Sequence, residues 1–211
     1  TERFQELTDA VREATDDVIV QHSTGGTAAP DALRAEPLRT DPEPDMASLD
    51  MGPLNRYQHL TSENTRALVD ALHEEMQARG IKPELEVFNG GHLNEALRIW
   101  DDLADPPYVN LVFGGGTTTI PSPRNLLNMV EDVPAGAECN VLAFGPHQLP
   151  LTTMGILLGC HVRVGLEDNL YYRKGEPAES NAQLVERTVR IAEELGRPVA
   201  STAEARDLLG L

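Results

Sequence analysis

The chain has 211 residues, a formal net charge of −17 and 40% hydrophobic residues, enough for one globular core. No apolar run approaches the roughly 20 residues of a membrane span, and the excess of carboxylates disfavours nucleic acid or an anionic membrane as a partner. We therefore expect one domain over residues 1–211, located in the cytoplasm, with no nucleic acid and no membrane among its partners.

Basic residues are skewed toward arginine, because Lys82 and Lys174 are the only lysines among 17 basic residues. An acid-rich, lysine-poor surface suits a high-salt cytoplasm, where screening removes self-repulsion between carboxylates. We interpret this as a sign of a halophilic source, although a GC-rich genome explains the arginine bias equally well.

The only two cysteines, Cys139 and Cys160, lie in apolar segments. We expect both to be buried free thiols.

Strands and helices alternate along the chain. Periodicity and breaker residues predict strands at 18–24, 46–50, 84–88, 108–113, 138–144 and 161–166. They predict helices at 4–15, 62–79, 92–102, 123–133, 148–158, 181–195 (with Ser180 as N-cap) and 202–209. This rhythm, without hairpin signals, indicates a parallel sheet.

The strands favour a barrel over an open sheet. Glu84 and Glu86 alternate with Leu85 and Val87, so one strand face is polar and the other apolar. Strands of an open, doubly covered sheet read instead as continuous apolar runs. We therefore predict a (β/α)8 TIM barrel, and because eight strands need about 250 residues, six of the eight β/α units are expected here. The domain is expected to be incomplete at its N-terminus.

The segment 163–169 (RVGLEDN) carries the richest chemistry, at the carboxyl end of a predicted strand. Alternation places Arg163 and Glu167 on one face, with Gly165 between them leaving room for a ligand. Glu167 is predicted as a metal ligand or general base. The alternative is a structural Arg–Glu pair, although a buried ion pair gains little stability.

Other strand ends offer groups that could bind substrate oxygens. Ser23, Thr24, Gly25 and Gly26 follow one strand with hydroxyls and a flexible turn, and Ser48 lies equivalently on the next. A tight turn is the simpler explanation of that glycine pair. Residues 114–116 are three glycines that could admit a substrate to the backbone. The histidines form no HxH or HExxH motif and are expected to be structural.

These residues resemble the β-keto acid cleavage enzyme family, typified by 3-keto-5-aminohexanoate cleavage enzyme. The resemblance rests on segments 163–169, 180–185, 23–26, 45–49 and 80–88 and on the helix start at 148–150, and it covers essentially the whole chain. It implies a zinc-dependent (β/α)8 barrel, usually a homotetramer. Such enzymes react a β-keto acid with acetyl-CoA, releasing acetoacetate and a new CoA thioester.

The resemblance also assigns roles. Zinc would be held by Glu167 and by two histidines of an HxH motif on the second barrel strand, which this chain lacks, and would polarise the substrate carbonyl. Arg163 and Asp168 would form the catalytic dyad that promotes deprotonation of the keto acid. Substrate oxygens would be bound by Ser23, Thr24, Gly25 and Ser48. Two alternatives remain open, another metal-dependent CoA-linked retro-aldol lyase or an inactive truncated barrel; the 211 residues alone are expected to be inactive.

Overall fold

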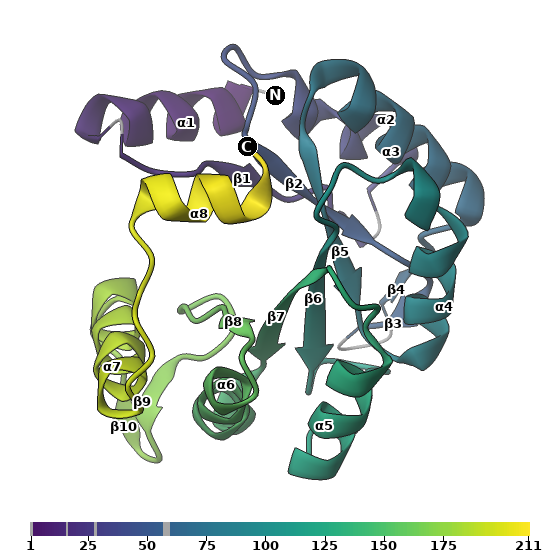
Figure 1. Cartoon of the computed structure of the whole chain (residues 1–211). Coiled ribbons are helices and arrows are strands. Elements are labelled where there is room, and N and C mark those ends of the chain that lie inside the picture. The colour runs from purple at the N-terminus through teal and green to yellow at the C-terminus, as the bar shows by residue number, and fades with distance from the viewer. Residues whose placement is uncertain (1, 16, 28, 57–59) are drawn as a thin grey trace.

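The main sheet is parallel and curves into half of a barrel. The computed structural model describes residues 2–15, 17–27, 29–56 and 60–211. Its six-stranded sheet has the order β1-β2-β5-β6-β7-β8, and every neighbouring pair is parallel. The strands are β1 (Gln21–His22), β2 (Met46–Asp50), β5 (Lys82–Val87), β6 (Tyr108–Phe113), β7 (Glu138–Ala143) and β8 (His161–Val162). Strands β1 and β8 are therefore the two edges of this sheet (Figure 1).

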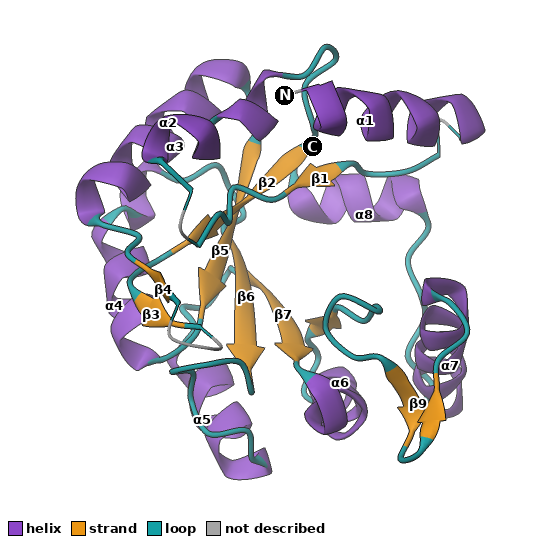
Figure 2. Ribbon diagram, turned by 180° about the vertical axis from the view of Figure 1, so that it is seen from behind, coloured by secondary structure: helices purple, strands orange, loops and turns teal. Residues whose placement is uncertain are grey.

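Helices surround the convex side of the sheet, and the concave side is open between α7, α8 and the strands (Figures 1 and 2). The α-helices are α1 (Glu2–Ala14), α2 (Asp31–Arg34), α3 (Arg66–Arg79), α4 (Gly90–Arg98), α5 (Pro123–Asp132), α6 (Gln148–Leu157), α7 (Asn181–Glu194) and α8 (Thr202–Leu209). Three 3-10 turns, η1 (Glu36–Arg39), η2 (Trp100–Asp102) and η3 (Gly145–His147), complete the connections. This arrangement agrees with the predicted alternation of strands and helices.

The alternation of side chains along β5 explains why the sheet has one apolar and one polar face. Leu85 and Val87 are fully buried in the core between the sheet and its outer helices. Glu84 and Glu86 point to the concave side, where both line a cavity. Burying the apolar face contributes roughly 25 cal/mol for each Å² removed from water. The convex face thus holds the fold together, while the concave face is left for chemistry.

Parts of the predicted pattern were wrong in detail. The strand predicted at 161–166 ends at Val162, and the one predicted at 18–24 is reduced to Gln21–His22. Two short antiparallel hairpins were missed: β3 (Leu54–Asn55) with β4 (Thr61–Ser62), and β9 (Tyr171–Arg173) with β10 (Glu176–Pro177). Their strands are only two or three residues long, too short to give a period-2 signal.

Helix starts follow side-chain caps. Helix α3 begins after Thr65, whose hydroxyl accepts a hydrogen bond from the Leu68 amide at 3.2 Å. The predicted start at 62 was therefore too early, because Ser62 belongs to β4. Helix α7 confirms its predicted cap, since the Gln183 amide donates to the Ser180 hydroxyl at 3.1 Å. Such caps satisfy amide groups that have no partner within the helix.

Candidate active site

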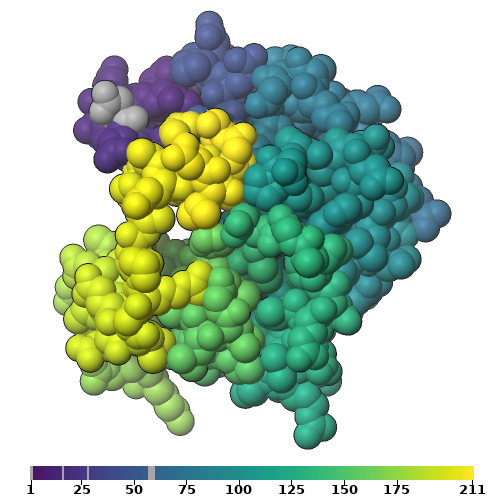
Figure 3. Space-filling view, viewed as in Figure 1, coloured from purple at the N-terminus to yellow at the C-terminus, as the bar shows by residue number. Residues whose placement is uncertain are grey.

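An open cavity of about 1530 Å³ occupies the concave side of the half-barrel. Figure 3 shows a hollow between the C-terminal segment, in yellow, and the green part of the chain. Polar side chains from several strands line it, including Ser48, Asp50, Glu84, Glu86 and Asn140. Near the carboxyl ends of parallel strands, barrel enzymes keep their active sites. The cavity is therefore the candidate active site.

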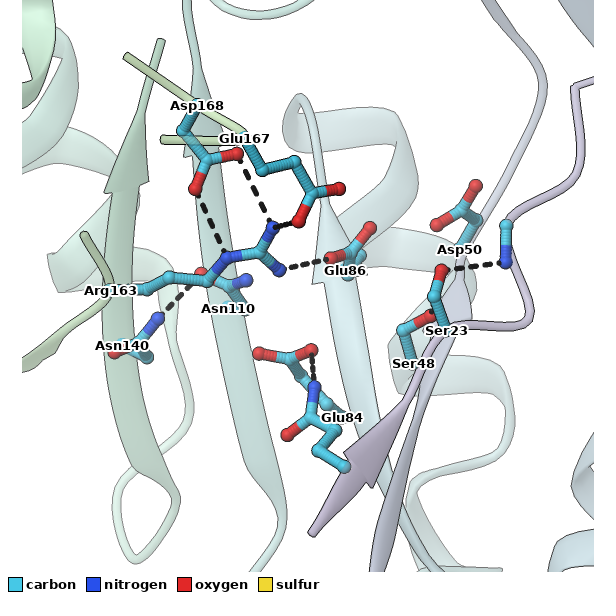
Figure 4. A network of polar contacts seen from close by, with 12 residues as sticks. Ser23, Ser48, Asp50, Glu84, Glu86, Asn110, Asn140, Arg163, Glu167 and Asp168 are labelled. Carbon is cyan, nitrogen blue, oxygen red and sulfur yellow. Dashed lines mark hydrogen bonds and ion pairs between the residues drawn. The ribbon is translucent and has the colours of Figure 1, made fainter. Parts of the chain in front are cut away.

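Arg163 is the centre of an ion-pair network in this cavity (Figure 4). Its guanidinium meets Asp168 through two contacts, Nε to Oδ2 at 3.2 Å and Nη2 to Oδ1 at 3.3 Å. Nη2 also lies 3.1 Å from Oε2 of Glu167, and Nη1 lies 3.5 Å from Oε1 of Glu86. One cation is thus shared by three carboxylates.

The backbone around Arg163 creates this network. The Arg163 amide still bonds to the Val141 carbonyl of β7 at 3.1 Å, so the residue extends the line of β8. The chain then turns, and the Gly165 carbonyl accepts hydrogen bonds from the amides of Asp168 and Asn169 at 3.2 and 3.1 Å. The turn returns Glu167 and Asp168 toward Arg163. The predicted shared face of Arg163 and Glu167 therefore arises from a turn and not from strand alternation.

Packing against α7 explains why residue 165 is a glycine, and the sequence alone did not indicate this contact. A Cβ atom on Gly165 would lie 3.2 Å from Oδ1 of Asn181, the first residue of α7. The same oxygen accepts a hydrogen bond from the Leu166 amide at 2.7 Å. The space beside Gly165 is thus occupied by the side chain that fixes the turn, and the expected room for a ligand is not there.

Burial and charge tune the Arg163–Asp168 pair. The Asp168 side chain is only 2% exposed. Burial raises the pKa of Asp168 above its ordinary value, and attraction to Arg163 opposes this without cancelling it. Burial lowers the pKa of Arg163, but Asp168 and Glu86 outweigh burial and raise the final pKa. A carboxylate of increased basicity beside a permanent cation can accept a proton and stabilise the negative charge that forms.

The predicted substrate-binding residues lie together, with Ser23, Thr24 and Gly25 directly after β1 and Ser48 within β2. The Ser48 hydroxyl is 3.5 Å from that of Ser23 and accepts a hydrogen bond from the Thr24 amide at 3.1 Å. The Gly25 amide donates to the Ser23 hydroxyl at 3.1 Å. Ser23, Ser48 and Gly25 line the same cavity as Arg163. Thr24 is buried, and its hydroxyl donates to the Ser48 carbonyl at 2.7 Å, so it holds the loop against β2.

Glu84 and Glu86, which line the cavity with Arg163, were not predicted as site residues. Burial raises the pKa of Glu84 to about 7, and a hydrogen bond from Gln21 opposes that shift. Burial, followed by repulsion from Asp50 and Glu84, raises the pKa of Glu86 well above its usual range. Both glutamates occur at alternate positions of a strand, so the polar face that predicted the barrel also marked them.

The described residues alone do not form a zinc site. Among them no group of three or more His, Cys, Asp or Glu is placed to hold a metal ion. Glu167 offers a carboxylate that is 82% exposed and paired with Arg163 through Oε2. Catalytic zinc needs three protein ligands. Glu167 therefore offers one exposed carboxylate, and the described residues place no second or third ligand beside it.

The surroundings of His22 are structural, and the two cysteines are free thiols. The His22 ring lies 2.7 Å from the Pro37 carbonyl and 2.8 Å from the Thr8 hydroxyl, and is buried. Cys139 and Cys160 are free; the predicted burial is confirmed for Cys160 but is wrong for Cys139, which is half-buried. In residues 2–15, 17–27, 29–56 and 60–211, none of the helices has the length and apolarity to cross a bilayer.

A half-barrel with an arginine–carboxylate network facing its concave cavity defines an enzyme of the barrel class. The profile of the β-keto acid cleavage enzyme family matches residues 1–211. The chain therefore belongs to this family of enzymes, as the sequence resemblance indicated.

Curated relatives agree with this assignment. The chain is 40% identical to 3-keto-5-aminohexanoate cleavage enzyme of Acetoanaerobium sticklandii, over all of this chain and 77% of that protein. It is 34% identical to 3-oxoadipate:acetyl-CoA acetyltransferase of Cupriavidus necator, over all of this chain and 75% of the relative. A solved structure, the binary complex of ObcA with oxaloacetate, superposes with a TM-score of 0.78 at 21% identity. The match covers all of this chain and 56% of ObcA, and at this identity it shows a shared fold alone.

Proposed function

We propose that this chain is the larger part of an enzyme that condenses a β-keto acid with acetyl-CoA and releases acetoacetate and a new acyl-CoA. The observation that carries the proposal is the Arg163–Asp168 pair, which faces the same cavity as the hydroxyls of Ser23 and Ser48. The names of two relatives support it, because one is a β-keto acid cleavage enzyme and another transfers acetyl from acetyl-CoA.

The residues of this chain would act in the following order. Ser23, Ser48 and the Gly25 backbone bind and orient the oxygens of the keto acid. Asp168 accepts a proton from C2, and the Arg163 guanidinium stabilises the resulting negative charge. The carbanion attacks the acetyl carbonyl and displaces CoA as a thiolate. The thiolate adds to the original keto carbonyl, the C2–C3 bond breaks, and the acetoacetate carbanion recovers a proton from Asp168.

Zinc dependence is part of the proposal, with Glu167 as one ligand and an upstream HxH motif as the other two. The chemistry that zinc supplies when bound in such a site is polarisation of a carbonyl oxygen. The Glu167 carboxylate, in the turn after β8, agrees with this role because its side chain is 82% exposed and lines the cavity. None of the steps assigned to Asp168, Arg163, Ser23 or Ser48 depends on it.

Closure of the half-barrel is also proposed. Two further β/α units between the edge strands β8 and β1 would complete a (β/α)8 barrel in which this chain supplies six units. Apolar side chains of α7 and α8 that line the cavity, such as Val189 and Leu208, would then be covered. The homotetramer rests on the family resemblance, and the cytoplasmic location rests on composition.

The decisive assay compares turnover of candidate β-keto acids with and without acetyl-CoA, using the protein as its gene encodes it. We expect turnover only with acetyl-CoA, with acetoacetate and an acyl-CoA formed in equal amounts. Turnover without the thioester would instead identify a CoA-linked retro-aldol lyase. No turnover with any acid, in a zinc-free preparation, would favour an inactive barrel.

A further inference from the structure

Arg56 is a second cationic group of the cavity, and neither the mechanism above nor the sequence patterns use it. It follows β3, and its amide donates to the Leu60 carbonyl at 2.7 Å across the hairpin. Its guanidinium lies over the Phe88 ring, 5.6 Å from the centroid. Nε donates to the Ser62 hydroxyl and Nη2 to Oδ2 of Asp50, each at 2.7 Å. These contacts fix the plane of the guanidinium.

The charge around Arg56 is not balanced. Its partner Asp50 is buried and also faces the buried guanidinium of Arg34 at 4.0 Å. Two cations therefore share one buried carboxylate, and the other acid near Arg34, Asp31, lies on the exposed surface of α2. Glu86 is aligned with Asp50 across β2 and β5, but burial raises its pKa well above the usual range, which favours the neutral acid.

The other end of the cavity has the opposite balance. Apart from Glu86, Arg163 contacts the two carboxylates of Glu167 and Asp168, so negative charge exceeds positive charge there. The cavity is thus acidic beside the proposed proton-transfer site and cationic beside Arg56. Arg56 keeps 28% of its side chain exposed, and Nη1 has no hydrogen-bond partner within the described parts of the chain. A planar, preoriented guanidinium with a free edge suits a carboxylate.

We propose that Arg56 binds a second carboxylate, at the side-chain end of the substrate, so that the preferred substrate is a dicarboxylic β-keto acid. This inference rests on the proposed function, because it names the substrate class of the same site. Arg56 acts as a specificity-determining residue and takes no part in proton transfer. The phosphates of acetyl-CoA are the competing anionic ligand, and the experiment separates the two.

The test uses the gene-encoded protein and two 3-keto acids of equal length, one ending in a carboxylate and the other in the corresponding amide. Calorimetry without acetyl-CoA measures binding, and turnover with acetyl-CoA is measured separately. In the wild type we expect the diacid to bind about 10- to 100-fold more tightly than the amide, the range of a charge-assisted hydrogen bond. Arg56→Gln removes this preference, and Arg56→Lys retains part of it. Arg124→Gln, on the exposed surface of α5, is the matched control and leaves it unchanged.

Three outcomes would overturn the assignment. Equal wild-type affinity for diacid and amide would show that the site does not bind the terminal carboxylate as an anion. An equal loss for both ligands in Arg56→Gln, accompanied by a lower melting temperature, would make Arg56 a structural partner of Asp50. A raised KM for acetyl-CoA with unchanged diacid binding would assign Arg56 to the cosubstrate. Failure of the proposed function is distinguishable, because turnover then fails while the binding preference remains.

Discussion

Arg163 and Asp168, only five positions apart in the sequence, meet through a two-point contact, Nε to Oδ2 at 3.2 Å and Nη2 to Oδ1 at 3.3 Å. The near-parallel pairing fixes the carboxylate relative to the guanidinium plane. Both residues line the cavity, but the Asp168 side chain is 2% exposed and that of Arg163 is 32% exposed, so the cation presents the larger surface. A substrate anion formed in the cavity would therefore meet Arg163 first.

Asp168→Asn is expected to lower kcat by about 100-fold or more, since the amide cannot accept the substrate proton. The amide oxygen can still accept from Arg163, so the melting temperature should change little. Only the deprotonated Asp168 can act as the base, and its pKa is raised above the ordinary value of 3.8. As the pH is lowered, wild-type activity should therefore be lost at a pH above 3.8. Asp132→Asn, at the exposed end of α5, is the control. A variant that keeps full activity would contradict the role of Asp168 as base.

Glu84 is expected to make stability depend on pH. Its pKa rises from 4.5 to about 7 on folding, so its stabilising contribution is complete below pH 4.5 and is lost as the pH rises through about 7. Glu84→Gln is neutral at every pH and lacks this loss. Between pH 4.5 and 8 the unfolding free energy of the wild type should therefore fall relative to the variant by about 3 kcal/mol, at 1.36 kcal/mol per pKa unit.

Urea unfolding at several pH values measures this difference. Glu131→Gln, on the exposed surface of α5, supplies the background change caused by removing a carboxylate. The same pH profile for Glu84→Gln and the wild type would show that Glu84 is not held as a neutral acid at low pH.

The polar face of the sheet could be predicted from the sequence because side chains alternate along a strand whatever the tertiary structure. Glu84 and Glu86 against Leu85 and Val87 predicted which face is polar, and the structure confirms it. The same rule failed after Val162, where a turn held by Gly165 and Asn181 replaces the strand. That turn depends on a residue of α7, which local pattern cannot supply.

Arg34 and Arg56 were missed for a related reason. Each is defined by its contact with Asp50, and the three residues come from different elements brought together only by folding. Arginines in a Pro-rich connection or after a two-residue strand resemble ordinary surface residues. A buried carboxylate at the end of β2 was the one available signal, because an isolated charge there needs partners.

Arg34→Met should destabilise the loop that carries Ser23 and Gly25. Arg34 is buried, and its Nε donates to the Thr24 carbonyl at 2.8 Å. Losing a charge-assisted hydrogen bond to a buried carbonyl costs about 2–3 kcal/mol. Chemical denaturation should show this loss, whereas Arg39→Met, which removes a surface ion pair with Glu75, should cost less than about 1 kcal/mol. Equal effects of the two substitutions would argue against a supporting role for Arg34.

Glu167→Gln should lower the zinc content of the gene-encoded protein, because a neutral amide is a poorer zinc ligand than a carboxylate. Metal analysis after dialysis measures it, with about one zinc per chain expected in the wild type. Glu186→Gln, exposed on α7, is the matched control. Unchanged zinc content in Glu167→Gln would remove Glu167 from the ligand set, and a zinc-free wild type would remove the metal from the proposal.

Stability should rise with salt if the acidic composition reflects a halophilic source. The net charge of −17 is spread over a 211-residue chain, and repulsion between exposed carboxylates acts over a Debye length of about 10 Å at 0.1 M salt. At 1 M that length falls to about 3 Å, so most of the repulsion is removed. The melting temperature should therefore increase from 0.1 M to about 1 M KCl, and most of the increase should occur at the low end because screening saturates. Ion pairs oppose this trend, but those of Arg66 and Arg98 with Glu95 and Asp70 lie at the surface and contribute little. A flat melting temperature across the titration would leave the arginine bias as a property of genome composition.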